Sequence, residues 1–333
     1  MKKDIKLVAM DIDGTLIGKN KYMTDYTRSI LKKSGEKGIH LVIASGRAFG
    51  AIPKMLLNIE GMEYVITSNG SSIFRIEDKK RIYGKDLDKN QVEELLEFYK
   101  KQNVPMEVFV QGEAYASKAY YEHPEIYGAS PTAVEYVHTT RTPVEDLENF
   151  VLENIKHIEG INFIVNDLVK KEQMRKELEK MSNIYVTSSV PRYIEVSHGD
   201  VCKRNAIQWL AAYLNVDRGS IAAFGDGEND IEMIEYAGYG VAMGNAVDSL
   251  KAICDRVALT VEEDGVARVI EEFFEEKFTE ILGMGIELTS KDHYNYVIMV
   301  CTCDRPKEET WKIIEIKNRI TGKMIITKRI YRT

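Results

Sequence analysis

Long hydrophobic runs are absent from this 333-residue sequence. No segment approaches the roughly 18 uninterrupted apolar residues that a membrane-spanning helix needs. The N-terminal residues Met1–Asp4 lead only into the short segment Ile5–Met10, whereas a signal peptide needs a longer apolar stretch and a small-residue cleavage site. The sequence therefore predicts no membrane association and a cytoplasmic location.

Cysteine is also scarce, with four residues in the whole chain. So few cysteines in a chain of this length do not make a disulfide framework. Cys301 and Cys303 are two positions apart and share one face of a predicted strand. A metal site there would need further ligands, and His293 is the nearby candidate. We favour half-buried thiols over a metal site.

An excess of positive charge is missing as well, because 45 Lys and Arg oppose 52 Asp and Glu, a net charge of −7. This balance argues against a nucleic-acid-binding protein. The composition of 44% hydrophobic and 29% charged residues is ordinary for a folded globular chain. A length of 333 residues exceeds the roughly 250–300 residues of a single core and predicts two or three domains.

The N-terminal part of the chain alternates short apolar runs with a helical pattern. The runs Ile5–Met10, Ile39–Ala44 and Tyr64–Thr67 predict buried strands. Between the first two runs, Thr24 is a favourable helix N-cap and Gly38 a favourable helix end. Strand, helix and strand at this spacing predict a βαβ unit and a parallel sheet.

From about residue 83 to residue 190 strands and helices still alternate, but the segments are more polar and no motif follows them. Predicted helices cover residues 91–102, 144–157 and 170–181, and predicted strands cover residues 105–110, 161–165, 185–187 and 193–196. This segment is an α+β insertion. The first pattern then resumes, with helices over residues 203–214, 229–236, 246–253 and 266–274 and strands over residues 220–224 and 240–243.

The last part of the chain, residues 276–333, has a different charge. It contains 11 Lys and Arg against 8 Asp and Glu, a balance of +3, so the remainder carries −10. Strands are predicted over residues 294–303, 310–316 and 324–330, with a hairpin turn at Thr321-Gly322. We therefore predict three parts: a core of residues 1–82 and 191–275, an insertion of residues 83–190 and a β-rich extension of residues 276–333.

Two carboxylates, Asp11 and Asp13, follow the first apolar run. Such a pair suits a phosphate ester, because one carboxylate can attack phosphorus while the other protonates the leaving alcohol and then activates water. Two anions attacking an anion require a divalent cation, and carboxylates with water suit Mg²⁺. A capped turn is the alternative interpretation, since Asp-Gly is common in turns.

Two further positions are weak signals taken singly. Ser45, followed by Gly46, can donate to a phosphoryl oxygen at a strand end, although Ser-Gly is also a common loop pair. Lys203 opens a predicted helix, where the helix dipole prefers anions, so it is better explained if it faces a phosphate. A solvated surface lysine is the alternative.

An acidic cluster, Gly225-Asp226-Gly227-Glu228-Asn229-Asp230, follows another apolar strand. Helix capping alone can explain acidic residues at a helix start. Ligands of open α/β sheets, however, bind at the carboxyl ends of the strands. Asp226 is therefore expected at the same sheet edge as Asp11, where it supplies a second carboxylate for a Mg²⁺ ion.

In this order, the clusters resemble those of the haloacid dehalogenase-like (HAD) phosphatases, specifically the Cof-type subgroup with a type IIB cap. The resemblance covers about residues 5–275. It rests on Asp11-Ile12-Asp13-Gly14-Thr15-Leu16, Ser45-Gly46-Arg47, Ser68-Asn69-Gly70, Lys203, Gly225-Asp226-Gly227-Glu228-Asn229-Asp230, Val241-Ala242-Met243-Gly244-Asn245-Ala246 and Glu263-Asp264-Gly265-Val266-Ala267. It implies an α/β fold with a Rossmann-like parallel-sheet core, and a cap that closes over the site and selects the leaving group.

The resemblance also implies roles at the matching positions. Asp11 would be the nucleophile and a metal ligand. Asp13 would be the general acid and base and would bind metal through its backbone carbonyl. Asp226 would complete the Mg²⁺ shell, and Asp230 would belong to the metal site by orienting Lys203 or a metal-bound water.

The remaining implied roles concern the phosphate. Ser45, the Gly46 amide and Lys203 would hold the phosphoryl group, and Asn229 would contact phosphate or substrate. The chain departs from the subgroup at Arg204, where a glycine usually follows the lysine, so Arg204 is expected to alter packing or reach the site. Residues 276–333 match nothing in the family pattern.

A small phosphorylated metabolite is the expected substrate. Sugar phosphates come first, with nucleotides, FMN or pyridoxal phosphate behind them. Polar residues of the insertion that are candidates to contact it are His123, Tyr127, Glu113 and Arg192.

Three other functions stay open at this point. A P-type ATPase shares the nucleophile but carries Thr where this chain has Asp13. A phosphosugar mutase keeps both aspartates but needs a second phosphate site, for which the insertion offers scattered basic residues such as Arg141 and Arg192. A regulatory or binding protein would bind a partner, or form a homo-oligomer, through residues 276–333, which are basic and contain Tyr294, Tyr296, Trp311 and Tyr331.

Overall fold

The computed structural model describes residues 4–274, 286–288, 297–301, 311–317, 324–325 and 331–332. The chain divides into two compact units, Met1–Phe273 and Phe274–Thr333. The first unit contains an eight-stranded sheet and a six-stranded sheet, which we call the core sheet and the cap sheet. Within the described residues no helix is long and apolar enough to cross a membrane.

The core sheet has the strand order β14-β13-β12-β1-β2-β3-β4-β5. Its strands are β1 (Leu7–Met10), β2 (His40–Ala44), β3 (Met62–Thr67), β4 (Ser72–Arg75), β5 (Lys80–Gly84), β12 (Ile221–Gly225), β13 (Tyr239–Ala242) and β14 (Arg256–Val257). Neighbours from β14 to β3 are parallel, which confirms the predicted parallel-sheet core, and β4 and β5 extend it in antiparallel pairing. Neither antiparallel strand was predicted; β5 is half-exposed and carries no apolar run, and β4 is only four residues long.

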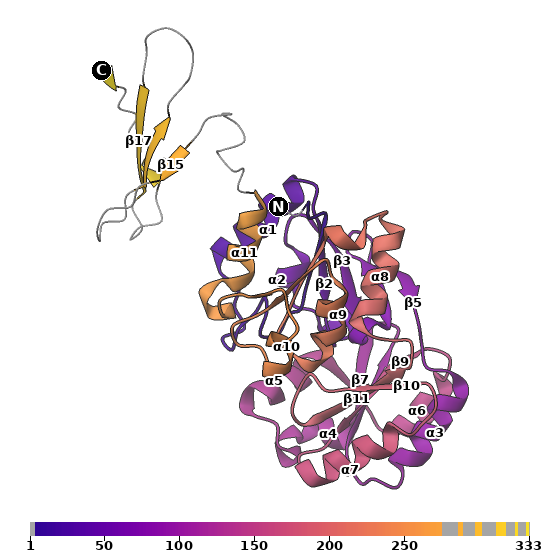
Figure 1. Ribbon diagram of the computed structural model, residues 1–333. Helices are drawn as coiled ribbons and strands as arrows, with labels where there is room; N and C mark the ends of the chain where they lie inside the picture. Colours follow the sequence, from indigo (N-terminus) through magenta and orange to yellow (C-terminus); the bar gives the residue numbers. More distant parts are fainter. Residues whose placement is uncertain are drawn as a thin grey trace. The chain divides into compact units, whose positions relative to one another are not determined.

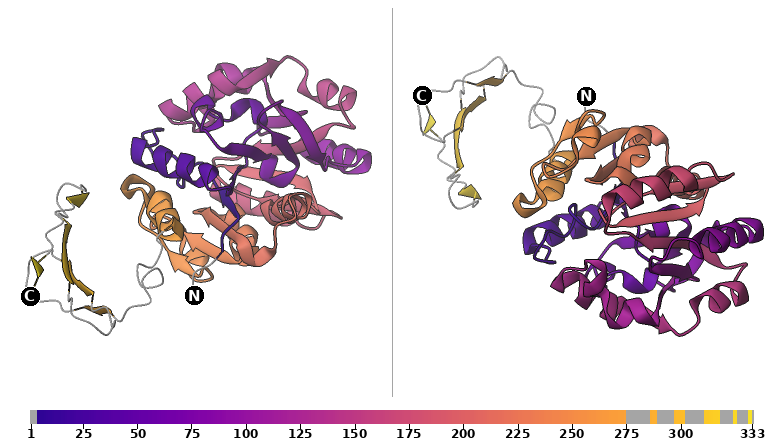
Figure 2. Two further views of the ribbon diagram at one scale, coloured as in Figure 1. Left: turned by 90° about the horizontal axis from the view of Figure 1, so that it is seen from above. Right: turned by 90° about the horizontal axis from the view of Figure 1, so that it is seen from below.

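Helices cover both faces of the core sheet (Figures 1 and 2). They are α1 (Asp25–Glu36), α2 (Lys54–Leu57), α8 (Lys203–Tyr213), α9 (Ile231–Tyr236), α10 (Asp248–Lys251) and α11 (Gly265–Phe274). The predicted N-cap of α1 is confirmed, because the Thr24 side chain accepts a hydrogen bond from the Thr27 N–H. Helices α1 and α11 lie side by side on one face of the core sheet, and the Tyr26 hydroxyl of α1 donates to Glu271 of α11 over 2.8 Å.

The cap sheet has the strand order β10-β11-β9-β6-β7-β8. Its strands are β6 (Met106–Val110), β7 (Glu113–Ser117), β8 (Arg141–Val144), β9 (Ile158–Ile164), β10 (Ile184–Thr187) and β11 (Tyr193–His198). All neighbours are antiparallel except β7 and β8. The predicted core segment 191–275 includes β11, yet this strand pairs with β9 and β10 and is therefore part of the cap sheet.

The five cap helices are α3 (Lys89–Tyr99), α4 (Lys118–Glu122), α5 (Pro131–Thr140), α6 (Leu147–Glu153) and α7 (Leu168–Leu178). The helix predicted over residues 144–157 begins too early, because Val144 ends strand β8 and the helix starts at Leu147. Pro143 is compatible with β8 since this strand is at the edge of the sheet.

The two faces of the cap sheet differ in polarity. Val108, Ile161 and Val196 belong to one face, which packs on α3, α6 and α7 in a continuous hydrophobic cluster. The alternate positions Glu107, Asn162 and Glu195 are cross-strand neighbours, because Asn162 pairs with both glutamates. Alternation along the strands therefore puts a row of three polar side chains on the other face.

A β-bulge between β6 and β9 connects the cap to the core. The pairing shifts between Phe109 and Val110, which leaves Glu159 as the extra residue of β9. The buried Glu159 carboxylate accepts hydrogen bonds from Ser68 and Ser72 of the core, each over 2.9 Å. Burial raises the pKa of Glu159, and Arg81 together with these two hydrogen bonds opposes that shift. The Glu159 side chain thus links the cap sheet to the core sheet.

The second unit contains β15 (Ile286–Leu288), β16 (Val297–Cys301), β17 (Trp311–Lys317), β18 (Met324–Ile325) and β19 (Tyr331–Arg332). Strand β17 pairs antiparallel with β16, β18 and β19. The β-rich character predicted for this extension is thus confirmed. The predicted turn at Thr321-Gly322, together with Cys303 and His293, lies outside the described residues.

Candidate active site

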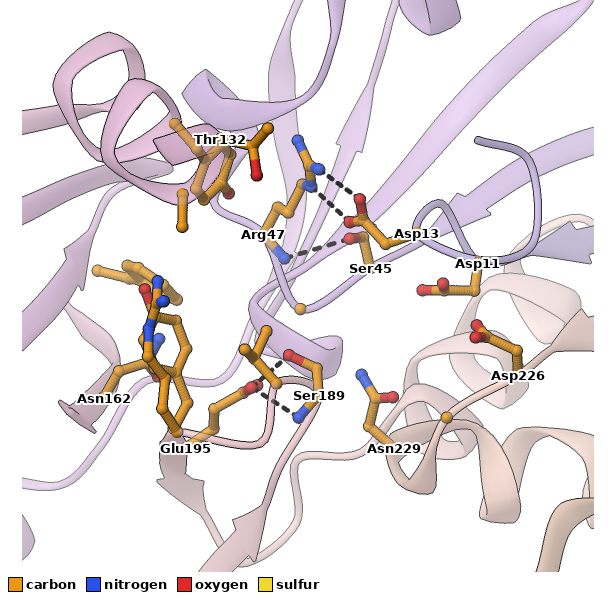
Figure 3. A pocket seen from close by; sticks show the side chains of 18 of the residues that line it. Asp11, Asp13, Ser45, Arg47, Thr132, Asn162, Ser189, Glu195, Asp226 and Asn229 are labelled. Atoms are coloured by element: carbon orange, nitrogen blue, oxygen red, sulfur yellow. Dashed lines mark hydrogen bonds and ion pairs between the residues drawn. The ribbon is translucent and has the colours of Figure 1, made fainter. Parts of the chain in front are cut away.

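A cavity of about 370 Å³ lies between the strand ends of the core sheet and the polar face of the cap sheet. Its core wall carries predicted residues from three separate motifs, including Asp11, Ser45, Asp226 and Asn229. Figure 3 shows these side chains pointing toward one another across the cavity, with Glu195 and Asn162 on the cap side.

The turn after β1 places Asp11 against Lys203. The Asp11 N–H continues the strand pairing to the Phe224 carbonyl over 3.0 Å, which fixes the backbone at the sheet edge. The buried Lys203 ammonium donates to Asp11 over 2.7 Å and to Asp230 over 2.6 Å. Lys203 is therefore buried between two carboxylates and is not a solvated surface lysine, and its predicted contact with a phosphate stays a prediction.

The electrostatics of this cluster follow from burial. Burial raises the pKa of Asp11 well above its usual value, Lys203 opposes this shift, and the carboxylates of Asp230 and Asp226 add to it. Burial disfavours the charge on Lys203, but the two carboxylates that it touches outweigh burial and raise its pKa. Three carboxylates face one ammonium, so full ionisation of the carboxylates would leave the cluster with surplus negative charge.

Asp226 reaches the cluster from the turn after β12. A Cβ on Gly14 would lie 2.1 Å from an Asp226 carboxylate oxygen, and Gly14 has φ +83°, so only glycine fits there. Burial, followed by the neighbouring Asp230, raises the pKa of Asp226 to about 7. The sequence did not single out Asn245, whose side chain donates to the Gly14 carbonyl over 2.8 Å.

Oxygens of Asp11, Asp226 and Asp230 lie within 4.8 Å of one another, a spacing that fits one metal ion. The surplus negative charge and the all-oxygen donors suit a hard divalent cation. The Asp230 carboxylate is largely committed to the protein, because one oxygen accepts from Lys203 and the other from the N–H groups of Asp226 and Gly227. Asp230 is therefore better placed to orient Lys203 and the turn at Asp226 than to bind a metal ion directly.

The Asp13 side chain points away from this carboxylate cluster. It forms a two-pronged ion pair with Arg47, over 2.8 Å to Nε and 2.6 Å to Nη2. Arg47 also packs on the Tyr136 ring of α5, 4.7 Å from the ring centroid, so a cap residue supports the arginine that holds Asp13. The motif Ser45-Gly46-Arg47 was noted in the sequence, but the contacts of Arg47 were not.

A chain of amides and carboxylates runs from the core to the cap beside Gly46. The Asn229 amide donates to the Asn69 carbonyl oxygen over 2.9 Å, and the Asn69 amide donates to Glu195 over 2.6 Å. A Cβ on Gly46 would lie 2.9 Å from the Asn69 oxygen, so the close approach requires glycine. Ser45 is buried beside it, and its hydroxyl accepts from the Arg47 N–H over 3.2 Å.

The structure thus brings all predicted site residues to one edge of the core sheet. The expectations for Arg204 and for the cap residues differ from what the structure shows. Arg204 is exposed and donates to Asn205, so it does not reach the site, because the helix turns it away from the buried Lys203. Of the cap candidates His123, Tyr127, Glu113 and Arg192, only Arg192 lines the cavity.

Comparisons with known proteins agree with this geometry. The family of haloacid dehalogenase-like hydrolases matches the chain over residues 8–270. The 5-amino-6-(5-phospho-D-ribitylamino)uracil phosphatase YcsE of Bacillus subtilis is 29% identical over 80% of this chain and 95% of its own length. The putative phosphatase YkrA of the same organism is 31% identical over 81% of this chain and 98% of its own length.

Among solved structures, a HAD subclass IIB sugar phosphatase has a similar fold, with a TM-score of 0.69 and 23% identity over 80% of this chain and 98% of that chain. The predicted core with an inserted cap of type IIB is confirmed by this likeness. The match to the family profile ends before the second unit begins. The chain belongs to the haloacid dehalogenase-like hydrolases and is a phosphatase of that family.

Proposed function

We propose that the chain is a Mg²⁺-dependent phosphatase that hydrolyses small phosphate monoesters through an aspartyl-phosphate on Asp11. The observation that carries this proposal is the buried cluster in which Lys203 donates to both Asp11 and Asp230. A buried lysine between two carboxylates has little structural value by itself, since a hydrophobic replacement is often as stable. Its place at the strand edge supports phosphoryl binding.

In the first step, an Asp11 carboxylate oxygen attacks phosphorus and the bond from phosphorus to the leaving oxygen breaks. Asp13 gives its proton to that oxygen, which departs as an alcohol. In the second step, Asp13 takes a proton from water while the water oxygen attacks phosphorus. The bond from phosphorus to Asp11 breaks and inorganic phosphate leaves.

Ser45, the Gly46 N–H and Lys203 are assigned to the phosphoryl oxygens, and Asn229 to phosphate or substrate. Arg47 acts as a positioning residue for Asp13, because its guanidinium holds both oxygens of the Asp13 side chain. The same pair must loosen when Asp13 donates its proton.

Asp11 and Asp226, with the backbone carbonyl of Asp13, are assigned to the Mg²⁺ ion. When bound, the ion neutralises the surplus negative charge between the carboxylates and the phosphoryl group. Its fit rests on the spacing of the acidic oxygens and on the raised pKa values of Asp11 and Asp226.

A sugar phosphate is the favoured substrate class, because the cap side of the cavity is polar and contains Asn162, Ser189 and Glu195, side chains that hydrogen-bond hydroxyl groups. A mutase remains the second candidate, since Arg141 and Arg192 both line the same cavity.

Hydrolysis of p-nitrophenyl phosphate and a panel of sugar phosphates, with and without Mg²⁺, tests the proposal. We expect Mg²⁺-dependent release of phosphate, and a loss of at least about 10⁴-fold in kcat for Asp11→Asn. The exposed Asp217→Asn is the matched control and should retain wild-type rates. Equal activity of wild type and Asp11→Asn, or inertness of both toward every ester, would refute the proposal. Phosphate transfer between sugar positions without net release would favour the mutase.

A further inference from the structure

The cap end of the cavity holds two side chains whose capacity to donate hydrogen bonds is largely unused within the described residues. Asn162 is 5% exposed, lines the cavity and has no side-chain hydrogen bond within the described residues. Buried polar groups are nearly always hydrogen-bonded, so an unpartnered buried amide that faces a cavity indicates a ligand. Figure 3 shows Asn162 on the cap wall, opposite the catalytic carboxylates.

Its cross-strand neighbours differ from it in this respect. Glu107 accepts a two-pronged contact from Arg141, over 3.0 and 2.9 Å. Glu195 accepts from Asn69 and from the Ser189 N–H. The polar row of the cap sheet is therefore satisfied at both ends and open only at Asn162, in the middle.

Arg192 is the second open group. Its Nε atom is buried without a hydrogen-bond partner, and one terminal nitrogen makes only a 3.5 Å contact to the Gly128 carbonyl. Its guanidinium lies over the Tyr193 ring, 5.2 Å from the centroid. Among the described residues no carboxylate lies within ion-pair distance of Arg192, although it lines the same cavity as Asn162.

The charge balance at this end points the same way. Arg141 and Arg192 both line the cavity. Burial opposes the raised pKa of both guanidinium groups, and the group that chiefly outweighs burial is Glu107 for Arg141 but Tyr193 for Arg192. Because both oxygens of Glu107 accept from Arg141, the guanidinium of Arg192 has no carboxylate of its own among the described residues. A guanidinium and a primary amide both donate hydrogen bonds to an oxyanion.

We propose that Arg192 and Asn162 form an oxyanion subsite for the leaving group. The preferred substrates are then phosphomonoesters that carry a second anionic group, a carboxylate or a second phosphate, at the end remote from the reacting phosphate. This inference rests on the proposed phosphatase function and names the substrate class of the same site. Such a substrate carries an additional negative charge that the neutral sugar of a simple sugar phosphate lacks.

Two matched substrate pairs test the subsite. Glucose 6-phosphate and 6-phosphogluconate differ by a carboxylate, and fructose 6-phosphate and fructose 1,6-bisphosphate differ by a second phosphate. We expect the anionic member of at least one pair to have a kcat/KM at least about tenfold higher, and the pair that responds identifies the anion. A ratio near one or below in both pairs would overturn the subsite.

Variants assign the preference to the named residues. Arg192→Gln should lower the ratio of anionic to neutral kcat/KM by about tenfold, to near one, the size expected for one charge-assisted contact. Asn162→Asp, which adds a negative charge without changing volume, should lower the same ratio. Arg218 is the matched control, because it also lies over a tyrosine ring and donates to a backbone carbonyl but does not line this cavity. Arg218→Gln should leave the ratio unchanged. A loss of equal proportion for both members in Arg192→Gln would show a structural role only.

Binding separates this proposal from the proposed function. Calorimetric titration of each pair into Asp11→Asn with Mg²⁺ measures affinity without turnover. If wild type hydrolyses no ester, the phosphatase proposal fails, and the subsite then stands or falls on whether the anionic member binds at least about tenfold tighter.

Discussion

The core sheet and the cap sheet bring polar side chains to one cavity by different routes. The parallel core strands are buried on both faces, so Asp11, Ser45 and Asp226 lie in turns just beyond strand ends. The cap strands are mostly antiparallel, and one face packs on the cap helices in a continuous apolar cluster. On the other face, Asn162 and Glu195 lie in mid-strand beside a smaller apolar cluster that includes Ile164 and Tyr193. In the core, candidate site residues can therefore be found in the sequence at the ends of apolar runs. In the cap, they can be found only when it is known which face of the cap sheet meets the core.

Buried charge also differs between the two regions. In the cap, Glu107 and Arg141 form a balanced pair of one carboxylate and one guanidinium. In the core, Asp11, Asp226 and Asp230 share the single ammonium of Lys203. A balanced pair can be replaced by apolar side chains, but the unbalanced core cluster needs a further cation, which is consistent with a functional rather than a structural role.

Lys203→Met should have the largest effect on this comparison. It removes the only cation of the buried core cluster and leaves two carboxylates unpaired. We expect kcat to fall by about 10³-fold or more and the free energy of unfolding without metal to fall by about 3–5 kcal/mol. Urea denaturation and steady-state kinetics measure both. The neighbouring Arg204→Met is the control, because Arg204 is exposed and should change neither quantity. A Lys203→Met variant with nearly normal activity would contradict the assigned role.

The cap pair provides the contrasting test. Glu107→Leu leaves the buried Arg141 without its carboxylate, and we expect a loss of about 3–5 kcal/mol in the free energy of unfolding. The double variant Glu107→Leu/Arg141→Met should recover most of that loss, because both charges are gone. Denaturation midpoints of the single and double variants decide the matter. A double variant as unstable as the single one would mean that the cap charges are not a self-contained pair.

Much of the core was predictable from the sequence because its strands are continuous apolar runs and its helices have local caps such as Thr24. The contact between Arg47 and Asp13 was not, because it joins residues of two different strand ends and is supported by Tyr136 of the cap. Likewise, Glu159 is buried only because a bulge turns it toward Ser68 and Ser72.

The pH dependence of metal binding is the third test. With its pKa raised to about 7, Asp226 holds a proton in the folded protein over a range where the unfolded chain has lost it. The folded state then binds more protons, so the stability of the metal-free protein should fall as pH rises from about 4 to 7. Mg²⁺ must displace that proton, and its apparent affinity should rise by about tenfold per pH unit up to pH 7.

Thermal melts with and without Mg²⁺ between pH 5 and 8 measure this effect. The Mg²⁺-induced rise in melting temperature should grow up to about pH 7 and then level off. Asp226→Asn should abolish the rise. An equal Mg²⁺ effect at pH 5.5 and 7.5 in wild type would contradict the prediction.

Arg47→Lys should give the smallest effect. Lysine keeps the positive charge but loses the two-pronged contact with Asp13 and the stacking on Tyr136. We expect kcat to fall by about tenfold, with a change in the free energy of unfolding near 1 kcal/mol. If kcat rises instead, the ion pair with Arg47 hinders proton transfer by Asp13. The contact of Arg47 with Tyr136 of the cap would then slow the reaction rather than support it.

By itself, the sequence determined the parallel core and the residues that follow its strands, because strand burial and strand ends are local properties of the chain. The tertiary structure decided which cap residues face the cavity. The alternation of side chains within one strand shows which residues share a face with Glu107. Only the pairing between strands that are distant in sequence places Asn162 between Glu107 and Glu195. The proposed selection of the leaving group by these cap residues therefore depends on strand pairings that no single segment encodes.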